Sequence, residues 1–167
     1  MKYDIGIPDT LKVESFGFPG ERTFRIFLDN SGKNISLWIE KQQLFELAMA
    51  IKRILDIVNI DPKDTNDLEP LSEAKDMPLM NFEFTVGRLS LAHKPNSNLF
   101  VVEAYNITDN SSEEPLLAFY SFGSQLDDLS EKAFKICAAG RPMCSLCGEP
   151  MDLELHMCSE PDGILQI

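Results

Sequence analysis

The sequence predicts an α+β protein in which an antiparallel sheet packs against two helices and a C-terminal zinc knuckle follows. Three observations lead to this prediction. Several short stretches alternate apolar and polar residues, which is typical of strands with one buried face. Two longer stretches carry apolar residues at helical spacing. Three of the four cysteines and one of the two histidines fall within residues 144–158.

The length and composition fit one soluble domain, or a domain core with a small appendage. The chain has 167 residues, of which 44% are hydrophobic and 25% are charged. Its 15 basic and 27 acidic residues give a net charge of -12, which argues against nucleic acid or an anionic membrane as partner. The first residues, MKYDIGIPDT, lack the apolar core of a secretory signal, and no apolar run is long enough to span a bilayer. A cytoplasmic protein is therefore expected.

The first half reads as a hairpin followed by a helix. Apolar residues alternate through residues 24–28 and again through 35–39, and the segment DNSGKN between them supplies turn residues. Trp38 falls on the opposite face of the second strand, which indicates that this sheet is partly covered on both sides. A helical stripe then runs from Leu44 to Val58, and Asp61-Pro62 ends it.

Residues 59–80 contain three prolines and six acidic residues against two lysines, so an acidic flexible linker is expected there. Strands follow at 82–91, with Gly87 as a bulge or bend, at 98–107 and at 116–123. A second amphipathic helix spans about 124–139, and Gly140 and Pro142 end it. Both halves end in a strand that runs into a helix, which indicates either a ββα-type internal duplication or the usual rules for packing helices on sheets.

The cluster at residues 144–158 has the spacing of a metal site. Cys144 and Cys147 form a C-x2-C pair, and Gly148 permits the tight turn of a zinc knuckle. His156 and Cys158 are two residues apart, so they point to the same side of an extended segment. Four such ligands close a tetrahedral shell. We therefore expect one structural zinc ion per chain, within a zinc-binding tail of residues 141–167 that follows an α+β domain of residues 1–140.

Other uses of these four side chains fit less well. A redox C-x-x-C pair belongs at a strand-to-helix junction and leaves His156 and Cys158 unexplained. A catalytic zinc keeps one position open for water, whereas here four protein ligands fill the shell. Iron is the lesser alternative to zinc, because a thiolate-rich tetrahedral site also accepts it.

A few residues outside the cluster are candidates for a second site. Glu40 and Lys41 stand where the strand meets the first helix, and Glu103 interrupts an apolar strand, with Arg88 as its candidate partner. Cys137 lies on the apolar side of its helix and reads as a core thiol. His93 lies near a turn and reads as a surface histidine.

Five segments of the chain resemble a known family. They are GERTFRIFL, ISLWIEKQQL, FTVGRLSLAH, FVVEAYN and AAGRPMCSLCGEPMDLELHMC. In this order they resemble the segments of a bacterial family, domain-of-unknown-function family 3090, over roughly residues 10–160. The resemblance implies that Cys144, Cys147, His156 and Cys158 match the family's metal-ligand pattern, and that residues 40–42 match its junction motif. The ending PDGILQI keeps Gly163 but lacks the aromatic and basic residues that commonly close the family's tail.

The expected function is a non-enzymatic, zinc-stabilised module that binds another protein. No phosphate-binding loop, nucleophile elbow or metalloprotease motif is present in the sequence. The first alternative is an enzyme or enzyme subunit with a site in the sheet cleft, built from Glu40, Lys41, Arg88 or Glu103. The second is a nucleic-acid-binding protein, for which a local basic face would have to form. Its candidate residues are Lys33, Lys41, Lys52 and Arg53.

Overall fold

The computed structural model describes residues 3–18, 20–58, 81–109 and 113–139. The first half contains β1 (Tyr3–Asp4), β2 (Thr10–Phe16), β3 (Thr23–Asn30), β4 (Lys33–Ile39) and α1 (Lys41–Val58). The second half contains β5 (Asn81–His93), β6 (Leu99–Asn106), the 3-10 turn η1 (Ile107–Asp109), β7 (Leu117–Phe122) and α2 (Gly123–Ala139). The predicted linker at 59–80 and the zinc-binding tail at 141–167 lie outside the described residues.

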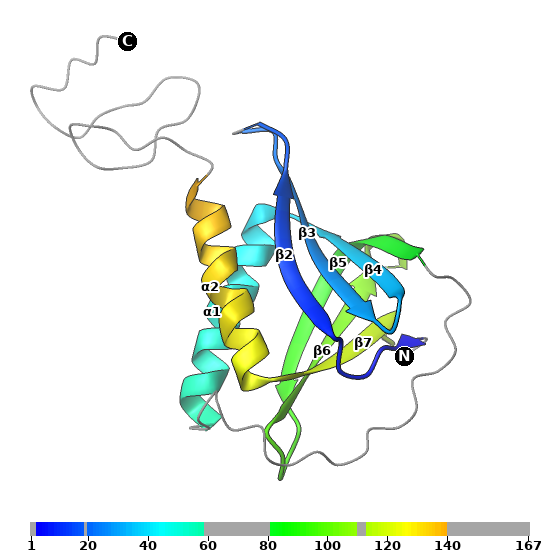
Figure 1. The fold of residues 1–167 in the computed structure, drawn as a ribbon, viewed down its shortest axis with the longest axis vertical. Coiled ribbons are helices and arrows are strands. Elements are labelled where there is room, and N and C mark those ends of the chain that lie inside the picture. Colours follow the sequence, from blue (N-terminus) through cyan, green and yellow to red (C-terminus); the bar gives the residue numbers. More distant parts are fainter. Residues whose placement is uncertain (1–2, 19, 59–80, 110–112, 140–167) are drawn as a thin grey trace, which may run out of the picture.

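The described elements form the predicted α+β arrangement, with one seven-stranded sheet and two helices lying side by side (Figure 1). The strand order is β1-β7-β6-β5-β4-β3-β2. The sheet is mixed, so the prediction of an antiparallel sheet is wrong at two places. β4 pairs with β5, and β1 pairs with β7, in parallel. β4 and β5 are parallel because α1 follows β4 in the sequence and returns the chain to the end of the sheet at which β4 began.

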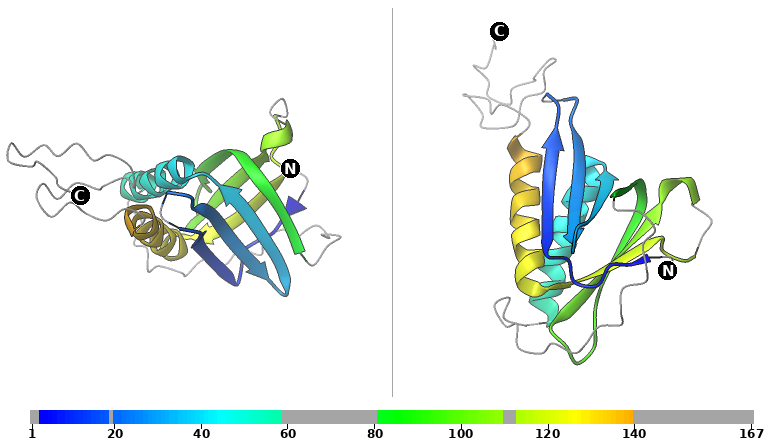
Figure 2. Two further views of the ribbon diagram at one scale, coloured as in Figure 1. Left: turned by 90° about the horizontal axis from the view of Figure 1, so that it is seen from above. Right: turned by 45° about the vertical axis from the view of Figure 1, so that its right-hand side comes forward.

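The two outermost strands of this order, β1 and β2, are consecutive in the chain. Residues 5–9 join them, and backbone bonds hold this short connection on both sides. The N–H of Tyr120 in β7 donates to the carbonyl of Gly6 at 2.8 Å, and the N–H of Asp9 donates to the carbonyl of Asp29 in β3 at 2.8 Å. The sheet therefore curls around one apolar face (Figures 1 and 2).

The two halves repeat the same order of elements. Three consecutive antiparallel strands, β2-β3-β4 or β5-β6-β7, lead directly into α1 or α2. The repeated unit thus has three strands and a helix rather than the two strands and a helix expected from the sequence. β5 matches β1 and β2 together, since its first residues pair with β4 in parallel and its later residues pair with β6.

The core lies between the concave side of the sheet and the two helices. The predicted helix stripes are buried, through Leu44, Leu47 and Ile51 on α1 and through Leu126, Leu129 and Ala133 on α2. Each helix packs on the first long strand of the other half, α1 on β5 and α2 on β2. Tyr3 of β1 and Phe82 of β5 link the two halves, since their rings meet edge-on with their centres 5.2 Å apart.

Two local predictions are confirmed. The β3–β4 turn places Ser31 at φ 54° and Gly32 at φ 83°, which is the two-residue hairpin turn that suits the twist of the strands. Gly87 is the extra residue of a bulge in β5, because Val86 pairs with Asn106 and Arg88 pairs with Tyr105. Neither described helix has the length and apolar character needed to cross a membrane.

Candidate functional site

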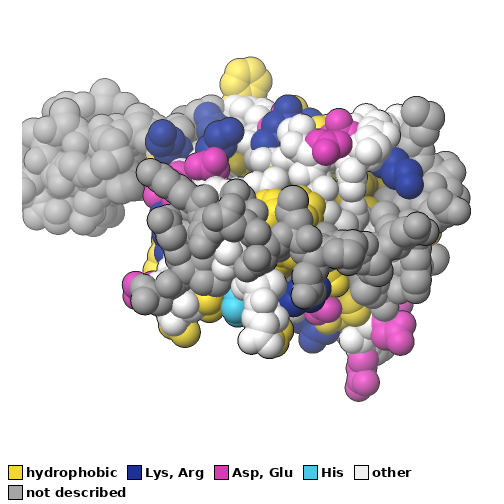
Figure 3. Space-filling model, turned by 60° about the horizontal axis from the view of Figure 1, so that its bottom comes forward, with side chains coloured by type: hydrophobic (Ala, Val, Ile, Leu, Met, Phe, Trp, Pro, Cys, Tyr) yellow, Lys and Arg dark blue, Asp and Glu magenta, His cyan; other side chains and the backbone are white. Residues whose placement is uncertain are grey.

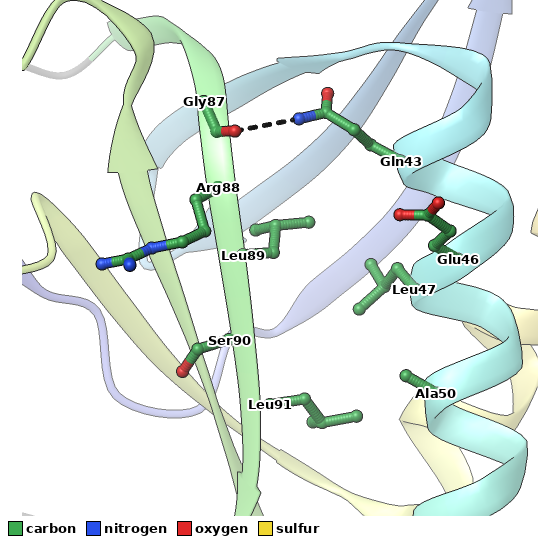
Figure 4. Close-up of a pocket in the computed structure, with 9 residues that line it drawn as sticks. All are labelled: Gln43, Glu46, Leu47, Ala50, Gly87, Arg88, Leu89, Ser90 and Leu91. Atoms are coloured by element: carbon green, nitrogen blue, oxygen red, sulfur yellow. Dashed lines mark hydrogen bonds between the residues drawn. The ribbon is translucent and has the colours of Figure 1, made fainter. Parts of the chain in front are cut away.

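Gln43 fixes the junction between β4 and α1. Its Oε1 accepts a hydrogen bond from the backbone N–H of Glu40 at 3.1 Å, which is how a side chain at the third helical position closes the first turn. Its Nε2 donates to the carbonyl of Gly87 at 3.2 Å (Figure 4) and to that of Val86 at 3.5 Å. Gln43 therefore ties the start of α1 to the bulge of β5.

Gln125 has the same role at the start of α2. Its Oε1 accepts from the backbone N–H of Phe122 at 3.1 Å and from the hydroxyl of Ser121 at 3.2 Å. Its Nε2 donates to the carbonyl of Pro8, just before β2, at 3.3 Å. Each glutamine thus caps its own helix and bonds the backbone of the other half, Gln43 at the bulge of β5 and Gln125 just before β2.

A cavity of about 320 Å³ lies between α1 and β5, beside Gln43. Its walls are Gln43, Glu46, Leu47 and Ala50 of α1 and residues 87–91 of β5. Leu89 and Leu91 point toward α1, whereas Arg88 and Ser90 point away from it (Figure 4). The lining contains one carboxylate, that of Glu46, beside the aliphatic side chains of Leu47, Leu89 and Leu91. Such a cavity can accept a small apolar group but provides no acid–base pair.

The four residues of the predicted cleft site do not come together. Glu40 and Lys41 lie at the start of α1. Arg88 and Glu103 lie on the outer face of β5 and β6, because the alternate residues of these strands, such as Val102, form the core. The cavity between α1 and β5 is lined by Arg88 and by none of the other three residues.

On the outer face of β5 and β6, Arg88 and Glu103 both contact Tyr105 rather than each other. The guanidinium carbon of Arg88 lies 4.0 Å from the ring centre of Tyr105. Glu103 Oε2 accepts from Ser90 Oγ at 3.0 Å and from the Tyr105 hydroxyl at 3.5 Å. Within the described residues, the predicted Arg88–Glu103 ion pair is not formed.

Tyr120 of β7 also lies on this outer face. Burial raises the pKa of its phenol, and the charges of Asp4 and Glu103 raise that pKa further. The phenol therefore stays protonated near neutral pH and can donate a hydrogen bond, but it is not poised as a base.

The outer face of β2, β3 and β4 carries a different arrangement, which we call the arginine–aromatic patch. Its members are Lys12, Glu14, Phe16, Arg25, Phe27 and Trp38. The guanidinium carbon of Arg25 lies 4.8 Å from the ring centre of Phe16, 5.1 Å from that of Phe27 and 5.7 Å from that of Trp38. Arg25 Nη2 donates to Glu14 Oε1 at 2.9 Å, which fixes the orientation of the stacked group.

The patch is held rigidly yet remains accessible. Trp38 Nε1 donates to Glu83 Oε2 at 3.0 Å, and the ring centres of Trp38 and Phe16 are 5.9 Å apart. Arg25 Nε is buried without a hydrogen-bond partner, whereas Phe16 of the patch has 40% of its surface exposed. Phe18, two residues beyond Phe16, is 80% exposed. Trp38 thus lies on the face that the sequence assigns to it, where Arg25 and Phe16 cover it in part.

A second apolar surface, the α1–α2 groove, lies where α1 begins and α2 ends. It measures about 490 Å³ and is lined by Lys41, Gln42, Phe45, Phe134, Cys137 and Ala138. The rings of Phe45 and Phe134 meet edge-on, with their centres 5.6 Å apart. Burial raises the pKa of the Cys137 thiol, while the charge of Lys41 lowers it. Cys137 is 7% exposed and is the predicted core thiol.

The basic residues proposed for nucleic-acid binding do not form one patch. Lys52 Nζ pairs with Asp127 Oδ1 at 2.7 Å and also with Glu131, and these hydrogen bonds raise the Lys52 pKa. Lys33 begins β4 and Lys41 follows its other end, roughly 20 Å away along the strand. On the face shown in Figure 3, basic side chains lie at separate places among acidic and apolar ones.

All four predicted metal ligands, Cys144, Cys147, His156 and Cys158, lie outside the described residues. Among the residues that the structure does describe, no group of three or more His, Cys, Asp and Glu side chains is placed to hold a metal ion. His93 is the last residue of β5, with its Nε2 2.6 Å from the carbonyl oxygen of Ser97 in the following turn and its ring against Phe100.

Sequence reasoning missed the arginine–aromatic patch and the paired glutamines. The outward positions of β2, β3 and β4 include Phe16, Phe27 and Trp38, and three aromatics on a solvent-side face were the available signal for the patch. The repeated pattern Q-L-x-x-L, at Gln43 and again at Gln125, was the signal for the shared helix start.

One family model matches this chain, that of the family described as "Protein of unknown function (DUF3090)", and it covers residues 3–158. The chain belongs to this family, as the resemblance noted in its sequence indicates. No curated protein and no solved structure matches the chain.

Proposed function

We propose that this member of the DUF3090 family is a non-enzymatic protein-binding module that docks its partner on the arginine–aromatic patch. One zinc ion, held by Cys144, Cys147, His156 and Cys158, stabilises its C-terminal knuckle, and the protein works in the cytoplasm. The observation that carries the proposal is the stacking of Arg25 on Phe16, Phe27 and Trp38, with the exposed Phe18 two residues after Phe16 in the chain.

The patch has the composition of a binding hot spot. Tryptophan, other aromatic residues and arginine dominate the energetic centres of protein interfaces. Here they lie on paired strands, so little side-chain freedom is lost on binding. Lys12, whose side chain is 45% exposed, adds a second cation beside Phe27. The fitting partner is a protein with an apolar surface flanked by carboxylates.

The alternatives receive less support from the described residues. The α1–β5 cavity contributes Glu46 as its one titratable carboxylate, and Arg88 points away from the cavity (Figure 4). For nucleic acid, the charge of Lys52 is offset by Asp127 and Glu131. An enzymatic site and a continuous basic face are both the weaker explanations.

The zinc part of the proposal rests on ligand chemistry. Two thiolates at C-x2-C spacing, with a histidine and a third thiolate at H-x-C spacing, make the closed shell that structural zinc prefers. A tail as short as residues 141–167 buries little apolar surface on its own, so a metal would provide its stability.

A photo-cross-linking amino acid in place of Phe18 tests the docking face in cells. The matched control carries the same amino acid in place of Ile57, which is 74% exposed and lies on α1. We expect one protein to be captured from position 18 and not from position 57. The same proteins captured from both positions would contradict the proposal.

Binding of the purified partner then tests the chemistry of the patch. Arg25→Gln should raise Kd at least about tenfold, as loss of a hot-spot residue does. Arg88→Gln is the matched control, because it also removes a guanidinium stacked on an aromatic ring, but in the other half of the sheet. Equal effects of the two variants, or no effect of Phe18→Ser, would overturn this docking face.

A further inference from the structure

The two ends of the α1–α2 pair differ in chemistry at matching positions. When the helices are aligned on Gln43 and Gln125, Phe45 corresponds to Asp127 and Lys52 corresponds to Phe134. At one end the Phe45 and Phe134 rings are in contact, and at the other end Lys52 is paired with Asp127. The same contact between helices is therefore apolar at one end and charged at the other.

The aromatic end is left partly open to solvent. Phe45 is 46% exposed and Met49, one turn further along α1, is 45% exposed. Phe45 and Phe134 border the α1–α2 groove of about 490 Å³. The charged groups of an ion pair at a surface are stabilised by solvent, whereas an exposed aromatic pair beside a groove favours an apolar occupant.

The chain itself provides a segment that begins at this groove. Cys137 and Ala138 form part of the groove wall, and α2 ends at Ala139, so residues 140–167 leave the helix at the groove. Within them, residues 151–158 alternate strictly. The odd positions are Met151, Leu153, Leu155 and Met157, and the even positions are Asp152, Glu154, His156 and Cys158. In an extended segment, all four apolar side chains share one side.

We propose that the apolar side of residues 151–157 docks in the α1–α2 groove. The two predicted zinc ligands of this segment, His156 and Cys158, belong to its other side, so metal binding and groove binding do not compete. Residues 140–167 carry five acids and one base, and Lys41 lines the groove with a complementary charge.

The chain length permits this docking. The residues between Ala139 and Met151 can span up to roughly 40 Å when extended, which leaves slack for a turn at Cys144–Cys147. A knuckle of this size has little interior in which to bury four large apolar side chains. The groove would complete its core, and the docking goes beyond the proposed partner face and does not depend on it.

Cross-linking within the full-length protein tests the docking directly. A photo-cross-linking amino acid replaces Phe45, and the same amino acid at Ile57 on α1 is the control. We expect the position-45 cross-link to join a peptide that contains residues 151–157 of the same chain. Cross-links to a second copy of the chain, or none to this peptide, would overturn the proposal.

Paired variants of the tail distinguish its two sides. Leu153→Ser with Leu155→Ser should abolish the cross-link and should speed amide exchange across residues 151–157 at least tenfold. Asp152→Ser with Glu154→Ser, on the other side of the same segment, should keep the cross-link and change amide exchange much less. Equal effects of the two double variants would overturn the docking. Metal analysis of the same samples reports separately on the proposed zinc site.

Discussion

The two halves of the sheet share an inner face and differ on their outer face. Aligned by strand register, each half has a row of apolar side chains that crosses its three strands toward the core. In the first half the row is Val13, Ile26 and Leu37, and in the second half it is Leu91, Val102 and Phe119. Both rows pack against the helices, so the same burial requirement acts on both halves.

The outer rows at the same register positions have little in common. The first half has Glu14, Arg25 and Trp38 where the second half has Ala92, Val101 and Tyr120. Likewise, the first half has the pair Lys12 and Phe27 where the second half has the pair Ser90 and Glu103. The scaffold does not require a cation on an aromatic cluster in one half and not in the other, so this difference supports the docking face proposed above.

The largest expected effect is the loss of a core side chain at matching positions. Leu37→Ala and Phe119→Ala should each lower the free energy of unfolding by about 3–4 kcal/mol, because both side chains are fully buried. Urea unfolding followed by circular dichroism should show one transition for each variant. A separate early transition in either variant would show that the halves unfold independently, contrary to their shared core.

The next largest effect tests the two capping glutamines. Gln43→Ala and Gln125→Ala should each cost about 1–2 kcal/mol, since each removes a cap and leaves carbonyls of the other half without a donor. Gln42→Ala is the control, because Gln42 is exposed and bonds Glu46 within the same helix. Urea midpoints of the three variants measure the difference. A loss at Gln43 alone would mean that the two junctions are not equivalent.

The helices and most strands could be predicted from the sequence because each has a strong local period. The stripe from Leu44 to Val58 and the alternation of β3, β4, β6 and β7 are consequences of burial on one side. β2 was missed because its inward residues are Leu11 and Val13, followed by Ser15, so the alternation stops early. The pairing of β4 with β5 depends on how α1 returns the chain, which no local pattern records.

The candidate sites also differ in whether a local stretch of sequence contains them. A metal site is concentrated in a short stretch, so Cys144, Cys147, His156 and Cys158 can be proposed from spacing alone. The arginine–aromatic patch gathers side chains from three strands, and the α1–α2 groove joins residues about 90 positions apart. Periodicity assigns each side chain to a face, but contacts between side chains require the register of the strands and the crossing of the helices.

Loss of the zinc ion proposed for the tail should have a smaller effect on the stability of the two halves. Cys147→Ser should reduce bound zinc from one ion per chain to none, while the free energy of unfolding of the α+β domain changes by about 1 kcal/mol or less. Ser145→Ala, between the same two cysteines, is the control and should keep the zinc. Elemental analysis measures the metal and urea unfolding measures the domain. Collapse of the whole domain on zinc loss would show that the knuckle is part of its core.

The smallest effect concerns the charged end of the helix pair. Lys52 has a raised pKa in the folded protein because of its hydrogen bonds to Asp127 and Glu131. A folded-state pKa above the unfolded value means that the stabilisation is fully present below the unfolded pKa and is lost as the pH rises through the folded pKa. Because the Lys52 side chain is 37% exposed, solvent screening limits its contribution to about 0.5 kcal/mol.

Urea unfolding of the wild type and of Lys52→Met, from about pH 8 upward past the lysine range, measures this contribution. The stability difference should be largest near neutral pH and should vanish in strong alkali. About 1 M salt should reduce it at neutral pH. Phe134→Leu, which changes the corresponding position at the aromatic end, should show a loss that depends on neither pH nor salt. A salt-independent loss in Lys52→Met would mean that its aliphatic stem, rather than its charge, holds the helices together, and the two ends would then be alike.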